Sequence, residues 1–161
     1  MTVRLRTVAE SDLPTFFEQQ REPAAIRMAA FPSRDWAAFQ SHWNGILSDE
    51  SVATRTILHA GEVAGHIVSF VQSGDREVGY WLGQSYWGQG VATRALAAFL
   101  GEVAERPLYA HVAKHNIASR RVLEKCGFRV VGDAPAFSTA GDERIEGLVF
   151  KLDARAEHPS A

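Results

Sequence analysis

The sequence of 161 residues lacks several features that identify whole classes of protein. It has one cysteine, Cys126, which excludes an internal disulfide and is typical of a reducing cytosol. No apolar run approaches the length that crosses a bilayer, and the first six residues lack the apolar core of a signal peptide. Lysine and arginine number 17 against 19 aspartates and glutamates, so the chain has no basic excess of the kind that binds nucleic acid. These absences predict a cytoplasmic protein that binds neither membrane nor nucleic acid.

The remaining composition is that of an ordinary globular protein. Apolar residues make up 46% of the chain and charged residues 22%, and a chain of 161 residues is long enough to enclose a core. The sequence has no internal repeat, low-complexity tract or linker. We therefore expect a single domain over residues 1–153, followed by a disordered tail over residues 154–161.

Two kinds of periodicity predict the secondary structure. Alternating β-branched and aromatic residues indicate strands, and apolar residues three and four apart indicate helices. The predicted strands cover residues 3–8, 53–58, 63–71, 77–82, 107–112 and 143–152, with a further strand starting at residue 129. Four helices are predicted. The first starts after Ser11 and ends before Pro23, and the second starts after Ser33 or Asp35. The third covers residues 91–105, and the fourth runs from a cap at Asn116 to Gly127. No regular element is predicted for residues 24–34.

The order of these elements predicts a mixed sheet. Short turns at residues 59–62 and 72–76 join three strands, which indicates an antiparallel meander. The helix over residues 91–105 then connects two strands and implies a right-handed crossover with a parallel pair. The fold class is therefore α+β.

The stretch of residues 86–93 carries two glycines where a strand gives way to a helix. Glycine permits positive φ and a close approach of the backbone to a ligand, and the first amides of a helix have no partner within it. Together with the helix dipole, these features predict a site for a phosphate or pyrophosphate. The alternative is a tight turn that binds nothing. Because the stretch has neither the dinucleotide-binding pattern nor the Gly-Lys-Ser/Thr of the P-loop, a phosphate site here must be of a third kind.

A second informative stretch covers residues 116–128. Asn116 is a favoured helix cap, and Gly127 is the terminator expected at the other end. Basic residues crowd the predicted helix, and Lys125 near its end suits the helix dipole. Helix capping alone would explain Asn116 and Gly127.

Both stretches resemble signatures of the GNAT superfamily of N-acyltransferases. Residues 87–93, Trp-Gly-Gln-Gly-Val-Ala-Thr, resemble its acetyl-CoA pyrophosphate loop, Gln/Arg-x-x-Gly-x-Gly/Ala, with Gly90 as the central glycine and Ala92 last. Trp87 replaces the Gln or Arg, and this Trp-Gly-x-Gly-x-Ala version is typical of the branch similar to ribosomal-protein N-terminal acetyltransferases. Residues 116–128 resemble the second signature, Asn-x-x-Ala/Ser before a helix that ends in Gly-Phe. The two signatures have the order and separation of the family.

The resemblance covers nearly the whole chain and implies the GNAT fold. That fold has a mixed, mostly antiparallel sheet of roughly six or seven strands, about four flanking helices, and strands that splay apart at the acyl-CoA site. Acetyl-CoA is implied as cosubstrate, with no metal, and a homodimer is left open because dimers are common among relatives. The implied coenzyme-binding residues are Trp81, Leu82, Trp87, Gly88, Gln89, Gly90, Val91, Ala92, Thr93, Asn116 and Ser119, of which Asn116 contacts the pantetheine arm.

The chemistry of acyl transfer to an amine assigns further roles. The amine must be neutral and the developing oxyanion needs a donor, for which GNAT enzymes use a backbone amide, here that of Trp81 or Leu82. At pH 7 a lysine amine is only about 0.04% neutral, while an α-amine is about 10–20% neutral. Glu77 stands where many relatives carry a general base, and its alternative role is an exposed carboxylate beside Arg76.

Other residues compete for these roles or are excluded from them. His66, His111 or water could replace Glu77 as the base. Many relatives protonate the departing thiolate with a tyrosine, but Leu123 stands at that register, so the resemblance assigns the leaving sulfur to Ser119. A hydroxyl can hydrogen-bond a sulfur, and the alternative for Ser119 is a role in the helix cap. Cys126, near a helix C-terminus where the dipole raises a thiol pKa, is not expected to be a nucleophile.

Together, the residues and the resemblance predict an acetyl-CoA-dependent N-acetyltransferase with Ser119 and Glu77 as catalytic residues and direct attack in a ternary complex. The acceptor is a primary amine, either a protein or peptide N-terminus or a small molecule. Residues 26–43 are the expected acceptor region, and their aromatic side chains could equally be core. Two alternatives stay open: a non-catalytic acyl-CoA sensor or scaffold of the same fold, and an unrelated phosphate-binding domain.

Overall fold

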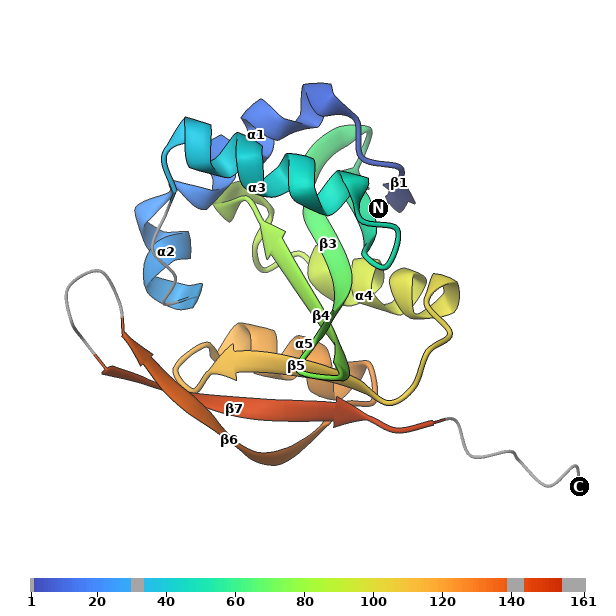
Figure 1. Cartoon of the computed structure of the whole chain (residues 1–161), viewed down its shortest axis with the longest axis vertical. Coiled ribbons are helices and arrows are strands. Elements are labelled where there is room, and N and C mark those ends of the chain that lie inside the picture. Colours follow the sequence, from blue (N-terminus) through green and yellow to red (C-terminus); the bar gives the residue numbers. More distant parts are fainter. Residues whose placement is uncertain (1, 30–33, 139–143, 155–161) are drawn as a thin grey trace, which may run out of the picture.

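The computed structural model describes residues 2–29, 34–138 and 144–154. Its seven strands form one sheet in the order β1-β2-β3-β4-β5-β7-β6 (Figure 1). The strands are β1 (Val3–Arg6), β2 (Ala53–His59), β3 (Glu62–Gln72), β4 (Asp75–Leu82), β5 (Leu108–Ala113), β6 (Arg129–Ser138) and β7 (Arg144–Leu152). The helices are α1 (Leu13–Gln20), α2 (Pro23–Ala29), α3 (Trp36–Ser48), α4 (Val91–Glu102) and α5 (Ile117–Lys125), with 3-10 turns η1 (Glu10–Asp12) and η2 (Gln84–Tyr86).

The connectivity of the sheet confirms the predicted mixed topology. Strands β1 to β4 pair antiparallel with their neighbours, and β7 pairs antiparallel with both β5 and β6. The crossover through α4 makes β4 and β5 parallel, and their register contains a single pair, Glu77 with Tyr109. Beyond that pair the two strands diverge toward their C-terminal ends (Figure 1). The sheet is therefore open at the end where the glycine turn follows β4.

The two faces of the sheet carry separate hydrophobic cores. Helices α4 and α5 cover one face, where Leu96, Phe99 and Leu123 pack against inward-facing residues of β3, β4, β5 and β7. Helices α1 and α3 cover the other face, where Phe16, Phe39 and Trp43 form a second cluster. Because successive residues of a strand point to opposite faces, each residue of β4 belongs to one side of the sheet.

Two strands approach each other unusually closely near the open end of the sheet. Gly65 on β3 pairs with Leu82 on β4, and a Cβ added to Gly65 would overlap the carbonyl oxygen of Trp81. Only glycine permits this approach, so Gly65 fixes the position of the last residues of β4.

Helix α2 is the main element that the sequence analysis missed. The sequence predicts no regular element for residues 24–34, but the chain from Pro23 to Ala29 is helical. Pro23 ends α1 as predicted, since α1 stops at Gln20, and it then serves as the first residue of a new helix, where its missing amide costs nothing. A single proline thus separates two helices, whereas the sequence analysis treated it only as a stop.

The cap predicted for the first helix was wrong. Ser11 lies exposed within η1, and the residue that organises this corner is the buried Asp12. Its carboxylate accepts hydrogen bonds from Arg6 (2.7 and 2.8 Å), from the Ala9 amide (2.9 Å) and from Thr56 (2.7 Å). Burial alone raises the pKa of Asp12, but these hydrogen bonds outweigh it and bring the pKa to about 2.

The remaining boundaries differ little from the predicted ones. Asp35 caps α3 by accepting from the Ala38 amide at 2.8 Å, while Ser33, the other predicted cap, lies outside the described residues. The predicted strand start at Glu143 and the tail from residue 155 onward are likewise outside them. Over residues 2–29, 34–138 and 144–154, no helix has both the length and the apolarity to cross a membrane.

Candidate acyl-coenzyme site

The glycine turn between β4 and α4 adopts the backbone conformation that its sequence predicts. Gly88 and Gly90 both have positive φ, 74° and 76°, in the left-handed region that favours glycine. A Cβ at Gly88 would meet no atom within 4 Å, so open space lies beside it. The indole Nε1 of Trp87 donates to the Leu82 carbonyl at 3.1 Å and holds the turn against the end of β4.

Helix α4 begins without a side chain that caps its first amides. Gly90 is the cap residue and has no side chain to offer, and the first turn of the helix contains no acidic residue. The free amides and the helix dipole therefore face the space beside the turn, which suits a phosphate or pyrophosphate.

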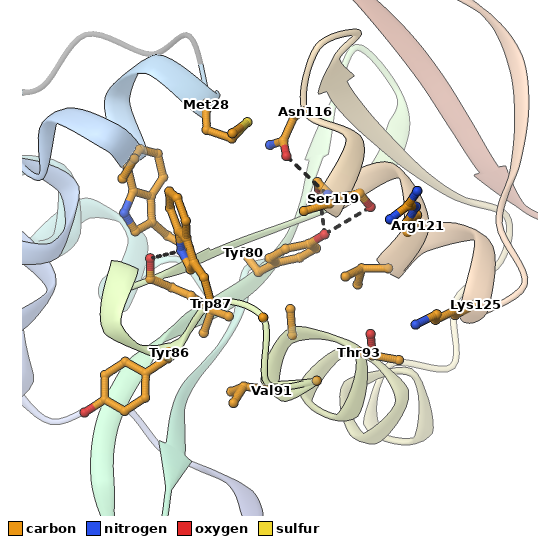
Figure 2. Close-up of a pocket in the computed structure, with 18 residues that line it drawn as sticks. Met28, Tyr80, Tyr86, Trp87, Val91, Thr93, Asn116, Ser119, Arg121 and Lys125 are labelled. Atoms are coloured by element: carbon orange, nitrogen blue, oxygen red, sulfur yellow. Dashed lines mark hydrogen bonds between the residues drawn. The ribbon is translucent and has the colours of Figure 1, made fainter.

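The opposite wall is the start of α5, where side chains rather than backbone carry the polar groups. The Asn116 Oδ1 accepts from the backbone amide of Ser119 at 3.2 Å, so Asn116 caps the helix as predicted. The hydroxyl of Ser119 takes no part in that cap. It lies 2.6 Å from the hydroxyl of Tyr80 on β4 (Figure 2).

These two walls enclose a cavity of about 400 Å³ that opens between β4 and α5 (Figure 2). Ten residues predicted to bind the coenzyme line it: Trp81, Leu82, Trp87, Gly88, Gly90, Val91, Ala92, Thr93, Asn116 and Ser119. Arg121 and Lys125 on α5 line it as well and add positive charge. The cavity thus combines an apolar floor, free helix amides and two cations, which fits a long ligand with an anionic portion.

Two predicted site residues lie apart from this lining. The side-chain Nε2 of Gln89 donates to the Ser85 carbonyl at 2.8 Å, so this side chain stabilises the turn from outside the cavity. Glu77 lies near the start of β4 and, by strand alternation, points to the face of the sheet opposite Tyr80 and Leu82.

The alternation of backbone amides distinguishes the two predicted oxyanion donors. The Gly83 amide donates to the Ala64 carbonyl of β3 at 2.9 Å. In an antiparallel pair, alternate residues direct their amides to the partner strand, so the Leu82 amide faces away from β3. It therefore faces the gap between β4 and β5, whereas the Trp81 amide faces β3.

Glu77 and the two histidines differ in their environments. The Glu77 carboxylate lies 3.7 Å from the Nε2 of the exposed His111. Burial raises the pKa of Glu77, His111 offsets part of that rise, and Asp75 adds to it. The ring of His66 packs against Phe16 and Trp43, each with centroids 4.8 Å away.

That packing makes His66 a poor base. Burial, with a smaller contribution from His42, lowers the pKa of His66 to about 3. An imidazole with such a pKa binds a proton only weakly at neutral pH. Glu77 and His111 are the better candidates among the three side chains.

Cys126 has the environment of a packed thiol. Its Sγ lies 3.6 Å from the Thr93 carbonyl, between α5 and α4. Burial raises the pKa of this thiol, in the direction predicted but through a different cause, and a raised pKa disfavours the thiolate that a nucleophile requires. Within residues 2–29, 34–138 and 144–154 there is no group of three His, Cys, Asp or Glu residues that could hold a metal ion.

The cavity contains residues that the sequence analysis did not name as site residues. They are Ala25, Met28, Tyr80, Tyr86, Ala118, Arg121, Val122 and Lys125. Helical spacing from Asn116 would have placed the α5 residues on one side of the site. For Tyr80, strand alternation could indicate the face but not the partner, because Ser119 is 39 residues away in sequence.

A family model described as "Acetyltransferase (GNAT) domain" matches residues 2–129 of the chain. No curated protein matches the sequence.

Solved structures share the fold over almost the whole chain. The ribosomal L7/L12 α-N-protein acetyltransferase RimL in complex with coenzyme A is 20% identical, with a TM-score of 0.80 over 97% of this chain and 96% of that one. Spermidine N-acetyltransferase from Vibrio cholerae, in complex with coenzyme A and spermine, is 15% identical, with a TM-score of 0.82 over 94% and 95%. A GNAT-family acetyltransferase from Bacillus anthracis is 19% identical, with a TM-score of 0.79 over 96% of each chain.

Proposed function

The chain belongs to the GNAT family of acetyltransferases, and on this premise we propose that it transfers the acetyl group of acetyl-CoA to a primary amine. The acceptor is a protein N-terminal α-amine or a small-molecule amine. We further propose direct attack in a ternary complex, without an acyl-enzyme.

One observation carries this proposal: the two walls of the cavity offer what the two ends of acetyl-CoA require. The uncapped start of α4 and the turn at Gly88 and Gly90 suit the pyrophosphate. Between the walls, the gap beside β4 leaves room for a pantetheine arm to lie along the strand, with Asn116 and Ser119 on its far side. The thioester would then reach the end of β4.

The proposed reaction uses three groups of this chain. The neutral amine attacks the thioester carbon, and the Leu82 amide donates to the oxygen that becomes negative. As the tetrahedral intermediate collapses, the C–S bond breaks and the amine nitrogen loses its extra proton to water, which relays it toward Glu77, five residues before Leu82 on β4. The Ser119 hydroxyl hydrogen-bonds the departing sulfur.

The acceptor reaches the thioester from the side of α1 to α3. Ala25 and Met28 of α2 line the cavity, and Trp81 points to this side, with its indole donating to the Gln19 carbonyl at 3.1 Å. Met28 belongs to residues 26–43, the region that the sequence predicts for the acceptor. RimL acts on a protein and the Vibrio cholerae enzyme on spermidine, so both peptide and polyamine acceptors belong among the substrates to be tested.

A second candidate function is an acyl-CoA sensor or scaffold. The observation that favours it is Leu123, which is fully buried in the core and leaves no tyrosine at that position of α5 to protonate the leaving thiolate.

The first experiment titrates the protein with acetyl-CoA by calorimetry and then follows thiol release with peptides carrying free N-termini, polyamines and small amines. We expect binding and turnover with at least one amine. ATP and NAD serve as competitors, because a general phosphate site would bind them too. Absence of acetyl-CoA binding would overturn the proposal, and binding without turnover on the whole panel would favour the sensor.

A further inference from the structure

We propose that Tyr80 is a positioning residue that directs the hydroxyl proton of Ser119 into the cavity, toward the sulfur of bound coenzyme A. The inference rests on the proposed function and extends it to a residue on a different element. It concerns how the sulfur end of the coenzyme is held, and it assigns no proton transfer to Tyr80.

The proposal assigns a direction to the hydrogen bond between the two hydroxyls, in which either oxygen could be the donor. The Tyr80 hydroxyl lies 2.6 Å from the Ser119 Oγ and 3.4 Å from the Ser119 carbonyl oxygen. An O–H donor bonds within about 2.5–3.0 Å, so the Oγ is the better acceptor for the phenolic proton. A phenol is also more acidic than an alcohol and is therefore the stronger donor, so in the proposed arrangement Tyr80 donates and Ser119 accepts.

The direction of this bond decides where the Ser119 hydroxyl proton can go. Ser119 has one proton and two lone pairs, and the bond from Tyr80 occupies one lone pair. The cap from Asn116 is made to the Ser119 backbone amide, so it does not use the hydroxyl. The Ser119 proton therefore has no partner in that arrangement and is available to an acceptor in the cavity, which both residues line (Figure 2).

The pKa of Tyr80 is consistent with a positioning role and not with proton transfer to the sulfur. Burial raises the pKa of Tyr80 to about 12 and outweighs the stabilisation that a hydrogen bond from Ser119 would give the phenolate. A thiol has a pKa near 8.5, so a thiolate would not remove that proton. The sulfur leaves as a thiolate that accepts a hydrogen bond from Ser119, and Tyr80 stays protonated throughout.

An acceptor-independent measurement tests this arrangement. A hydrogen bond from Ser119 stabilises the thiolate, so it lowers the pKa of the coenzyme A thiol in the complex, which ultraviolet absorbance of the thiolate reports as a function of pH. Arg121 and Lys125 line the cavity and Cys126 acts electrostatically on Tyr80, but replacing one hydroxyl leaves all three in place. The comparison between variants therefore isolates the hydroxyl pair.

We expect Tyr80→Phe to raise the pKa of the bound thiol by about one, a tenfold loss of acidity. Ser119→Ala should raise it by at least as much, and the double variant should add nothing to Ser119→Ala, because Tyr80 acts only through Ser119. Tyr109→Phe on β5, outside the cavity lining, controls for loss of a tyrosine hydroxyl and should leave the thiol unchanged. With an amine acceptor, Tyr80→Phe should lower kcat about tenfold and change the KM for acetyl-CoA little.

The possible results separate the two proposals. If coenzyme A does not bind the wild type, the proposed function fails and the inference fails with it. If coenzyme A binds but Tyr80→Phe leaves the thiol pKa and kcat as in wild type, the inference alone is overturned. An additive effect of Tyr80→Phe on top of Ser119→Ala, together with a lower Tm, would assign Tyr80 a purely structural role and also overturn it.

Discussion

The two walls of the cavity present different kinds of polar group. At the start of α4 the polar groups are backbone amides, exposed because Gly88 and Gly90 provide no side chain to cover them. At the start of α5 they are side chains, those of Asn116 and Ser119, and Ser119 depends on a partner from β4. The first wall is local in sequence, and the second is assembled across 39 residues.

This difference predicts which substitutions each wall tolerates. A backbone site is sensitive to any Cβ that strains the turn and is indifferent to side-chain chemistry nearby. A side-chain site is sensitive to the loss of a single hydroxyl. Gly90→Asp tests the backbone wall directly, Gly65→Ala tests the strand contact that supports it, and changes at Glu77 and Asp12 test groups outside both walls.

Gly90→Asp should weaken acetyl-CoA binding at least about 100-fold, measured by calorimetry. Any Cβ at Gly90 would require a left-handed conformation, which costs roughly 1–2 kcal/mol, and a carboxylate would repel the pyrophosphate. Gly74→Asp is the matched control, since Gly74 has φ +85° in the β3–β4 hairpin with nothing within 4 Å of an added Cβ. If the control weakens binding as much, the loss at Gly90 is not local to the site.

Gly65→Ala should weaken acetyl-CoA binding about tenfold and lower the free energy of unfolding by roughly 2 kcal/mol. The added methyl group would displace the Trp81 carbonyl and with it the Leu82 amide proposed for the oxyanion. Gly79→Ala on β4 is the control, because its Cβ would meet only the Val68 Cγ2 at 4.0 Å. Equal behaviour of the two variants in urea unfolding and calorimetry would contradict the role given to Gly65.

Glu77→Gln should lower kcat/KM about tenfold and alter the acid limb of the pH profile. Burial raises the pKa of Glu77, so as the pH falls the wild type loses its carboxylate base through that raised pKa. The glutamine variant cannot titrate and should lack this limb. His111→Gln removes the neighbour 3.7 Å away and should shift the wild-type limb to higher pH without abolishing it. A glutamine profile parallel to wild type would leave water or His111 as the base.

Asp12→Asn should leave acetyl-CoA binding unchanged and cost about 2 kcal/mol of stability at pH 7. The folded pKa of about 2 is below the ordinary value, so the stabilisation from Asp12 is present above about pH 4 and is lost as the pH falls toward 2. Urea unfolding at several pH values measures it, and Asp35→Asn at the exposed cap of α3 is the control. A variant as pH-dependent as wild type between pH 4 and 2 would assign the acid lability to other carboxylates.

The sequence predicts the elements whose signals are local. The meander from β2 to β4, the turn at Gly88 and Gly90, and the cap at Asn116 follow from alternation, glycine and capping patterns within a few residues. Helix α2 was missed because Pro23 both ends one helix and begins the next.

The parts that could not be predicted depend on contacts between distant segments. Ser11 satisfies the capping rule as well as Asp12 does, and only the fold, by placing Arg6 and Thr56 beside Asp12, decides between them. Likewise, strand alternation gives the face of Tyr80, but its bond to Ser119 exists only once β4 and α5 lie together.

The separation of the two cores by the sheet also bears on how this enzyme can change over generations. The cluster under α1 and α3 shares no buried residue with the cluster under α4 and α5, and substitutions on opposite faces of a sheet without common partners add nearly independently. Residues of the cluster under α1 and α3 can therefore vary, in nature or by directed evolution, without disturbing the core under α4 and α5, whereas Ala25 and Met28 of α2 line the cavity itself. A library of variants confined to that face offers a route to new amine acceptors with little effect on the coenzyme site.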